Sequence, residues 1–158
     1  MQRSKGFSLI ELLIVVAIIL IIAAVAVPSF LRSRIAANEA AAVAALRTLN
    51  TAQVSYNSAY PTVGYANSLT ALGGASCSAP TSTSACLIDT ALATGQRGGY
   101  NFAMVNVSGT PFSTYNAIAT PILYNYSGTR YYCSFADAVV RVSMTAITTC
   151  DTTINPQQ

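Results

Sequence analysis

The side chains able to transfer protons or attack an electrophile are few in this sequence. Histidine is absent, and the five carboxylates are far apart along the chain: Glu11, Glu39, Asp89, Asp137 and Asp151. Acid–base catalysis needs positioned groups within hydrogen-bond reach of a substrate, which only folding could assemble from so sparse a set. No spacing typical of a metal, phosphate or nucleophile site accompanies these residues. The sequence therefore predicts no active site, no metal and no cofactor, and a protein that is not an enzyme.

Four cysteines are the remaining reactive side chains, and all follow a long apolar segment: Cys77, Cys86, Cys133 and Cys150. An even number of cysteines beyond a membrane segment indicates disulfides formed in an oxidising compartment. Three pairings are open. We favour Cys77–Cys86 and Cys133–Cys150, because sequence neighbours close the smaller loops.

The apolar segment has the length of a membrane span. Leu12–Val27 is uninterrupted by any polar residue, and the stretch from Phe7 to Val27 holds one charge, at Glu11. Its length is enough to cross a hydrocarbon core of about 30 Å. A secretory signal has a shorter apolar stretch followed by small residues at a cleavage site. The apolar segment here runs directly into Pro28, so we expect a permanent anchor.

Helix is expected to continue beyond the anchor. No glycine or proline occurs between Leu31 and Tyr56, and the segment is rich in alanine, the strongest helix former. Apolar and amide side chains recur at helical spacing, which predicts one buried face and places Arg47 and Glu39 on other faces. We expect Arg32, Arg34 and Glu39 to be solvated. A helix from Phe7 to Tyr56 would be about 75 Å long, too long to be buried in a domain of this size.

The rest of the chain reads as a loop followed by strands. Tyr60-Pro61 ends the helix, and residues 61–99 are rich in turn formers, with 87–93 undecided between helix and strand. From Gly99 onward the hydrophobic period is two. The predicted strands are 100–105, 115–120, 131–135 and 139–143. The fold class is therefore α+β, with the second half of the long helix packed against a roughly four-stranded antiparallel sheet.

The segment Lys5–Val16, KGFSLIELLIVV, resembles the prepilin signature shared by type IV pilins and type II secretion pseudopilins. That signature combines a glycine, then usually a phenylalanine, and a glutamate five residues after the glycine, at the start of an apolar helix. Gly6, Phe7 and Glu11 occupy these positions, and Pro28 matches a proline common in the middle of the family's helix. A long helix followed by a sheet extends the resemblance, more loosely, over the whole chain.

The resemblance implies a maturation step and an assembly contact. A prepilin peptidase would cut between Gly6 and Phe7 on the cytoplasmic side and methylate the new amino group of Phe7. The carboxylate of Glu11 would pair with the terminal amine of an adjacent subunit and fix the axial register. Pro28 would either kink the helix or, as in related filaments, mark where it melts, although no glycine aids melting here. A loop closed by Cys133 and Cys150 also resembles the disulfide-bounded C-terminal region of many pilins.

These expectations define a domain plan. Residues 1–6 form a leader removed on maturation, residues 7–30 form a transmembrane and filament-core helix, and residues 31–158 form the globular domain. Within that domain we expect a helix half (31–58), a connecting loop (59–98), and a sheet with a C-terminal loop (99–158). The precursor would sit in the bacterial inner membrane with its C-terminal domain outside the cytoplasm, and the mature chain in an extracellular filament.

The resulting function prediction is a structural subunit of a type IV pilus. Its partners would be copies of itself in a helical filament, the inner membrane, prepilin peptidase and the pilus assembly machinery. The alternatives are a type II secretion pseudopilin, an adhesive or DNA-binding minor tip subunit, and an anchored domain that never polymerises. The net charge of +3 falls to about +1 without Arg3 and Lys5. No specific nucleic acid is therefore indicated, because such binding requires a broad basic face.

Overall fold

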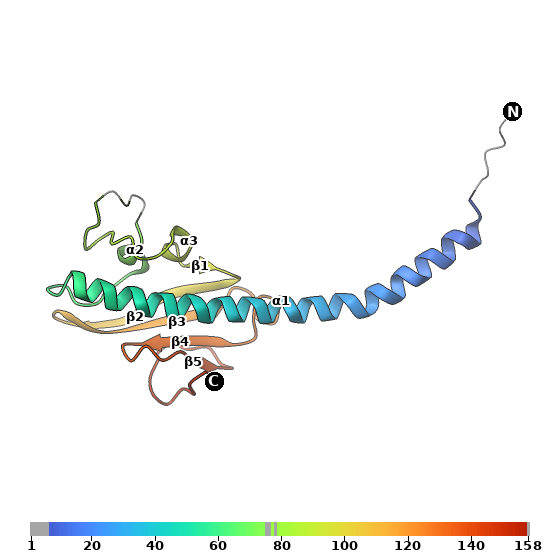
Figure 1. Cartoon of the computed structure of the whole chain (residues 1–158). Coiled ribbons are helices and arrows are strands. Elements are labelled where there is room, and N and C mark those ends of the chain that lie inside the picture. The colour runs from blue at the N-terminus through green and yellow to red at the C-terminus, as the bar shows by residue number, and fades with distance from the viewer. Residues whose placement is uncertain (1–6, 75–76, 78, 158) are drawn as a thin grey trace. The chain divides into compact units, whose positions relative to one another are not determined.

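The computed structural model describes residues 7–74, 77 and 79–157. One long helix, α1 (Leu9–Ala59), is followed by two short helices, α2 (Leu69–Leu72) and α3 (Thr90–Ala93), and then by five strands (Figure 1). The strands are β1 (Gln96–Arg97), β2 (Tyr100–Gly109), β3 (Phe112–Pro121), β4 (Tyr131–Phe135) and β5 (Arg141–Ser143). The chain divides into two compact units, Met1–Arg34 and Ile35–Gln158, so that α1 contributes its apolar half to the first and its remaining half to the second.

The five strands form one sheet in the order β1-β2-β3-β4-β5, and every neighbouring pair is antiparallel. Sequence-adjacent strands pair because each connection is short, as in a meander. β2 ends at Gly109, directly before the turn into β3, and the φ of +105° at Gly109 disfavours a residue with a side chain. The α+β prediction is confirmed. The two-residue β1 was not predicted, and the last strand begins at Arg141 rather than Val139.

The core of the second unit lies between α1 and one face of the sheet (Figure 1). The buried helix residues recur every three or four positions, as the sequence predicts: Ala42, Val43, Ala45, Leu46, Leu49, Ala52 and Tyr56. Four large aromatic side chains from the sheet complete this core: Tyr100, Phe102, Tyr115 and Tyr132. Side chains on β4 alternate between faces, so Tyr132 meets the helix while Cys133 joins a smaller cluster elsewhere.

The connection between α1 and the sheet carries the two short helices. Ser68 caps α2 by accepting a hydrogen bond from the Ala71 N–H at 3.2 Å, and Asp89 caps α3 by accepting one from the Leu92 N–H at 2.9 Å. The segment 87–93, which its sequence leaves undecided, is therefore helical only over its last four residues. The strong cap at Asp89 explains that outcome.

Candidate functional site

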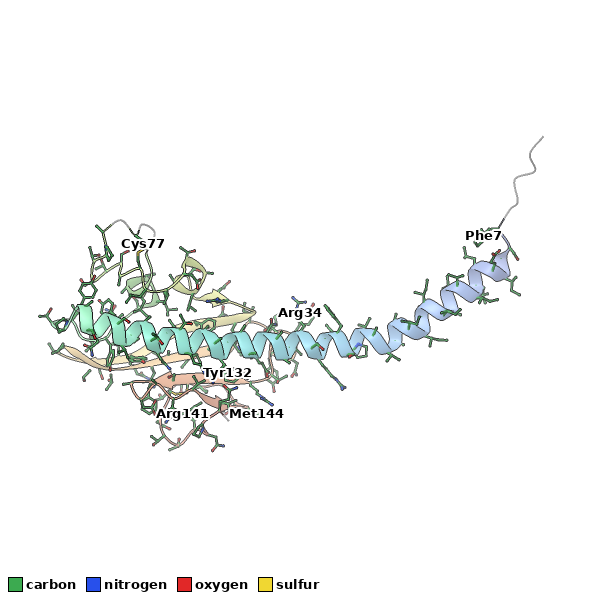
Figure 2. All side chains as sticks on the ribbon, in the orientation of Figure 1. Phe7, Arg34, Cys77, Tyr132, Arg141 and Met144 are labelled. Atoms are coloured by element: carbon green, nitrogen blue, oxygen red, sulfur yellow. A yellow bond between two sulfur atoms is a disulfide. The ribbon has the colours of Figure 1, made fainter. Side chains whose placement is uncertain are left out.

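The amino-terminal end of α1 carries the residues that the sequence singled out for assembly. Phe7 is 75% exposed and lies before the helix begins (Figure 2). Glu11 lies in the first helical turn and is exposed. The helix N-terminus bears partial positive charge, which stabilises a carboxylate at this position. Gly6, the other half of the expected cleavage site, is outside the described residues.

The first half of α1 presents apolar side chains on every side (Figure 2). The large ones between Leu9 and Phe30 are between 46% and 81% exposed. In the described chain, α1 is the one helix long and apolar enough to cross a membrane, judged by length and composition. A helix that is hydrophobic all round is stable only when other material surrounds it, either lipid or further helices.

Pro28 lies inside α1, and the helix is continuous across it. Proline has no backbone N–H, so the carbonyl of Ala24 lacks its usual intrahelical donor. One turn further on, the Ser33 hydroxyl donates to the Ser29 carbonyl at 3.1 Å, a bond that competes with the regular helical pattern. The helix is therefore held by fewer regular backbone hydrogen bonds around Pro28. A kink or local melting there stays a prediction.

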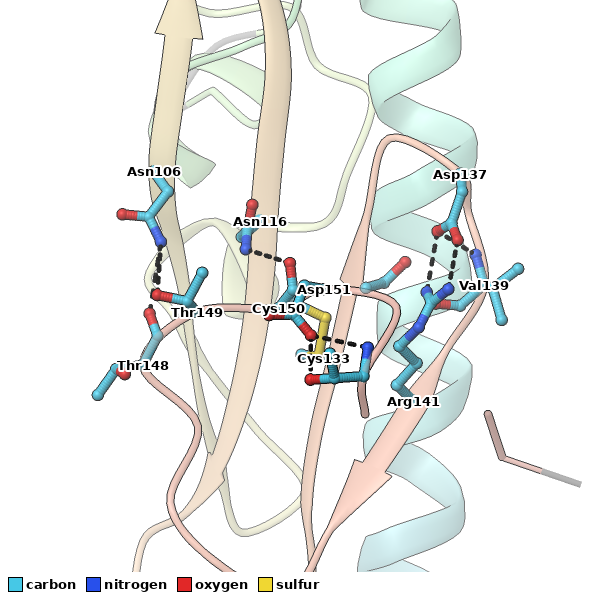
Figure 3. Close-up of a disulfide and its surroundings, with 12 residues drawn as sticks. Asn106, Asn116, Cys133, Asp137, Val139, Arg141, Thr148, Thr149, Cys150 and Asp151 are labelled. Atoms are coloured by element: carbon cyan, nitrogen blue, oxygen red, sulfur yellow. Dashed lines mark hydrogen bonds and ion pairs between the residues drawn. A yellow bond between two sulfur atoms is a disulfide. The ribbon is translucent and has the colours of Figure 1, made fainter. Parts of the chain in front are cut away.

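Both pairs of cysteines are bonded, Cys77 to Cys86 and Cys133 to Cys150. The predicted Cys133–Cys150 pair is confirmed. Figure 3 shows this disulfide. Its two residues are buried with Ile147 in a cluster separate from the main core. The Asn116 side chain donates to the Cys150 carbonyl at 2.8 Å. The bridge and this hydrogen bond together hold the C-terminal segment against β3 and β4.

Two buried amides hold the second half of α1 on the globular domain. The Asn50 amide donates to the Ala138 carbonyl at 3.0 Å, and its oxygen accepts from Tyr115 and Ser134. Gln53 exchanges two hydrogen bonds with the backbone of Ala66. The sequence signal for both was a polar amide in an otherwise apolar row. Their bonding partners, however, are visible only in the fold.

Glu39 was expected to be solvated, and that prediction is wrong. Its side chain is 12% exposed, and one carboxylate oxygen accepts from the Thr129 N–H at 2.9 Å and the Thr129 hydroxyl at 2.8 Å. The Tyr132 hydroxyl donates to the other oxygen at 3.4 Å. Burial, reinforced by the negative charge of Glu39, raises the pKa of Tyr132. Glu39 therefore ties α1 to the connection between β3 and β4.

The three basic residues of the sheet region each lie near a carboxylate. Arg97 pairs with Asp89 at 2.7 Å, and Arg141 with Asp137 at 2.6 Å. Arg130 lies 3.9 Å from Glu39. Paired charges of opposite sign do not produce the broad positive potential that phosphate backbones select. Within residues 7–74, 77 and 79–157, no group of histidine, cysteine and acidic side chains is placed to hold a metal ion.

The comparisons with known proteins agree with the amino-terminal motif. Residues 1–27 match the family model of the prokaryotic N-terminal methylation motif. The chain is 48% identical over 54 residues to the type IV major pilin protein PilA of Myxococcus xanthus, which covers 34% of this chain and 24% of that protein. It is 54% identical over 46 residues to the type IV wide pilus major component PilA4 of Thermus thermophilus, covering 29% of this chain and 35% of that protein. No solved structure matches.

The predicted resemblance to type IV pilins is confirmed by these matches. The matched segments span about a quarter to a third of the length of the curated relatives. The methylation motif covers Phe7, Glu11 and the apolar run up to Val27. The segment with a pilin-like sequence is therefore short. It includes most of the first half of α1, whose apolar side chains are exposed.

Proposed function

We propose that this chain is a structural subunit of a type IV pilus, made as a membrane-held precursor and polymerised through α1. The observation that carries the proposal is a methylation motif joined to an apolar helix whose side chains are exposed all round. The globular domain buries its own core and does not need that helix half for its packing. An apolar surface of this extent has to be covered, either by lipid or by the apolar helices of other subunits.

The proposed sequence of events follows from the chemistry of that helix. Prepilin peptidase cleaves between Gly6 and Phe7 and methylates the new amino group, while residues 7–30 hold the subunit in the inner membrane. Assembly then exchanges lipid for the apolar helices of neighbouring copies. In this apolar setting the carboxylate of Glu11 pairs with the amino terminus of an adjacent subunit, because an unpaired charge there is costly.

The two relatives are named as major components of their pili, which favours the same role here. A structural rather than catalytic role is consistent with the few titratable side chains. The outer surface of the filament would then be formed by the sheet and by the C-terminal segment fastened through Cys133–Cys150. Whether that filament serves motility, adhesion or DNA uptake depends on partners that assembly brings to this surface.

The test is mass spectrometry of filaments sheared from cells that make this protein. We expect a dominant subunit that starts at N-methylated Phe7 and has all four cysteines oxidised. A chain that still starts at Met1, or one found in the membrane fraction and never in filaments, would contradict the proposal. A mature chain present only in trace amounts beside another dominant pilin would instead assign it a minor-subunit role.

A further inference from the structure

The connection between β3 and β4 carries a compact apolar patch. We call residues Ile122–Arg130 the β3–β4 loop. Four of its large side chains are exposed, at 45% to 58%: Ile122, Leu123, Tyr124 and Tyr126. Exposed apolar residues are ordinarily scattered singly, and a cluster of them marks a contact surface.

The β3–β4 loop is held by hydrogen bonds within itself, so the exposure of these side chains is built into its structure. The Leu123 N–H donates to the Ser127 hydroxyl at 3.0 Å, and the Ser127 N–H donates back to the Leu123 carbonyl at 2.8 Å. The Asn125 N–H donates to the Gly128 carbonyl at 2.9 Å. At Gly128, a Cβ would collide with the Tyr100 ring, so the turn fits only with glycine there.

The β3–β4 loop is fastened to the first residues of α1 that belong to the globular unit. The Asn38 amide donates to the Ser127 carbonyl at 2.9 Å, and Glu39 binds both the N–H and the hydroxyl of Thr129. Asn38 follows Val27, the last residue of the apolar run, by eleven helical residues. At a rise of about 1.5 Å per residue, eleven residues correspond to about 17 Å of helix. These hydrogen bonds therefore tie the patch to α1 at Asn38 and Glu39, about three turns of helix beyond the apolar run.

The composition of the β3–β4 loop suits a lipid headgroup layer better than a protein pocket. Tyrosine is enriched at membrane–water interfaces, where its ring is buried and its hydroxyl stays hydrated. The loop itself has no carboxylate, and it ends at Arg130, whose side chain is 47% exposed and lies 3.9 Å from the Glu39 carboxylate. Arg32 and Arg34, also exposed, lie on the intervening helix. Exposed apolar and tyrosine side chains, on a domain whose helix carries Arg32 and Arg34, match a bilayer surface that includes anionic lipids.

We propose that, before assembly, the β3–β4 loop inserts Ile122, Leu123 and Tyr124 into the headgroup layer of the membrane that α1 spans. This inference rests on the proposed function, because it requires α1 to hold the precursor in a bilayer. The contact orients the globular domain at the membrane surface. The β3–β4 loop then has to leave the headgroup layer when each subunit is extracted from the membrane into a filament.

The absence of tryptophan from the chain allows a direct test. Tyr124→Trp places the sole indole at the patch, and Val54→Trp places it at another exposed site of the same unit, 56% exposed and 16 residues beyond Asn38 on α1. Each full-length variant is reconstituted in vesicles of phosphatidylcholine and phosphatidylglycerol that contain lipids nitroxide-labelled near the headgroup. Quenching of the indole by the labelled lipid and by aqueous iodide is then measured.

We expect the labelled lipid to quench the indole of Tyr124→Trp several-fold more than that of Val54→Trp, and iodide to show the opposite order. Equal lipid quenching of the two variants would overturn the proposal. If Tyr124→Trp becomes shielded from iodide only in sheared filaments, the occupant of the patch is a second copy of the chain and the lipid contact is likewise excluded. Tyr126→Trp repeats the measurement in case the first substitution disturbs the ring stacking between Tyr124 and Tyr131.

This experiment distinguishes a failure of the proposed pilus function from a failure of the proposed membrane contact. Strong lipid quenching in a chain that never enters filaments would contradict the pilus function and retain the membrane contact. Filaments built from mature subunits, together with no preferential lipid quenching, would retain the pilus function and remove the membrane contact.

Discussion

At the scale of single residues, Arg141 and Asp137 form the most enclosed ion pair in the described chain. The guanidinium donates to both carboxylate oxygens, at 3.1 and 2.6 Å, and its side chain is 6% exposed (Figure 3). It also lies over the Phe135 ring at 4.4 Å. Partial burial by itself would raise the pKa of Asp137, but hydrogen bonds from Arg141 and the Val139 N–H outweigh burial and lower it.

The lowered pKa of Asp137 predicts a loss of stability in acid. The unfolded chain binds this proton more readily than the folded chain does. The contribution is therefore complete above the unfolded pKa of about 4 and is lost as pH falls through the folded pKa. Asp137→Asn should be less stable than the parent at neutral pH, because Arg141 is left buried beside a neutral partner. The difference should shrink as pH falls below about 4. Urea unfolding midpoints measured across this range would show it.

Asp89→Asn is the matched control. Asparagine keeps the capability to cap α3, and the pair with Arg97 is exposed, at 46% and 47% of the two side chains. Exposed pairs contribute about 0–1 kcal/mol, so this variant should track the parent across the pH range. A stability deficit in Asp137→Asn that is constant with pH would assign the effect to packing rather than to charge.

At the scale of elements, the two disulfides do different work. Cys133–Cys150 spans 17 residues and is buried, and it fastens the segment after β5 to β4. Cys77–Cys86 spans 9 residues, and Cys77 is exposed. The longer bridge removes more freedom from the unfolded chain, and its loss also disturbs the packing of Ile147.

Replacing both residues of each bridge by serine should separate these roles. We expect Cys133→Ser/Cys150→Ser to lower the free energy of unfolding by about 3–5 kcal/mol, and Cys77→Ser/Cys86→Ser by about 2 kcal/mol. The first variant should also expose residues 144–157 to proteolysis before the rest of the domain unfolds. Equal losses, with no early cleavage, would show that the C-terminal segment is held by other contacts such as the one from Asn116.

At the scale of the whole molecule, assembly should depend on the charge of Glu11. In cells that also make the parent chain, we expect Glu11→Ala and Glu11→Gln to enter filaments about tenfold less than the parent, because the neighbouring amine would be left unpaired in an apolar core. The ratio of variant to parent in sheared filaments and in the membrane pool is measured by mass spectrometry. Ser8→Ala, one turn away at the same helix end, should incorporate normally.

Glutamine is the informative substitution in that pair. It keeps the length and the helix propensity of glutamate and one oxygen acceptor, but it replaces the other carboxylate oxygen by an amide donor and removes the charge. If Glu11→Gln incorporates as well as the parent while Glu11→Ala does not, the side chain acts by hydrogen bonding or by stabilising the helix end. Normal incorporation of both variants would remove Glu11 from the assembly mechanism.

The sequence alone determined the features that depend on local pattern. The run from Leu12 to Val27 predicts an apolar helix, because an uninterrupted apolar stretch of this length is typical of a helix that spans a hydrocarbon core. The three- to four-residue spacing after Leu31 predicts which face of α1 is buried, and the period of two after Gly99 predicts strands. The motif around Gly6, Phe7 and Glu11 is equally local. These features can be predicted from the sequence without knowing which residues pack against them.

Only the tertiary structure decided which polar groups are buried, because their partners are distant in sequence. Glu39 reads as a solvated helix residue until Thr129 is brought against it, 90 residues later in the chain. Asn50 is satisfied by Tyr115, Ser134 and Ala138, none of which its own neighbourhood indicates. A buried polar group is tolerated only when it is hydrogen-bonded, and the bonding is a property of the fold. The apolar patch of the β3–β4 loop was likewise placed by tertiary contacts, the hydrogen bonds that Asn38 and Glu39 of α1 make with Ser127 and Thr129.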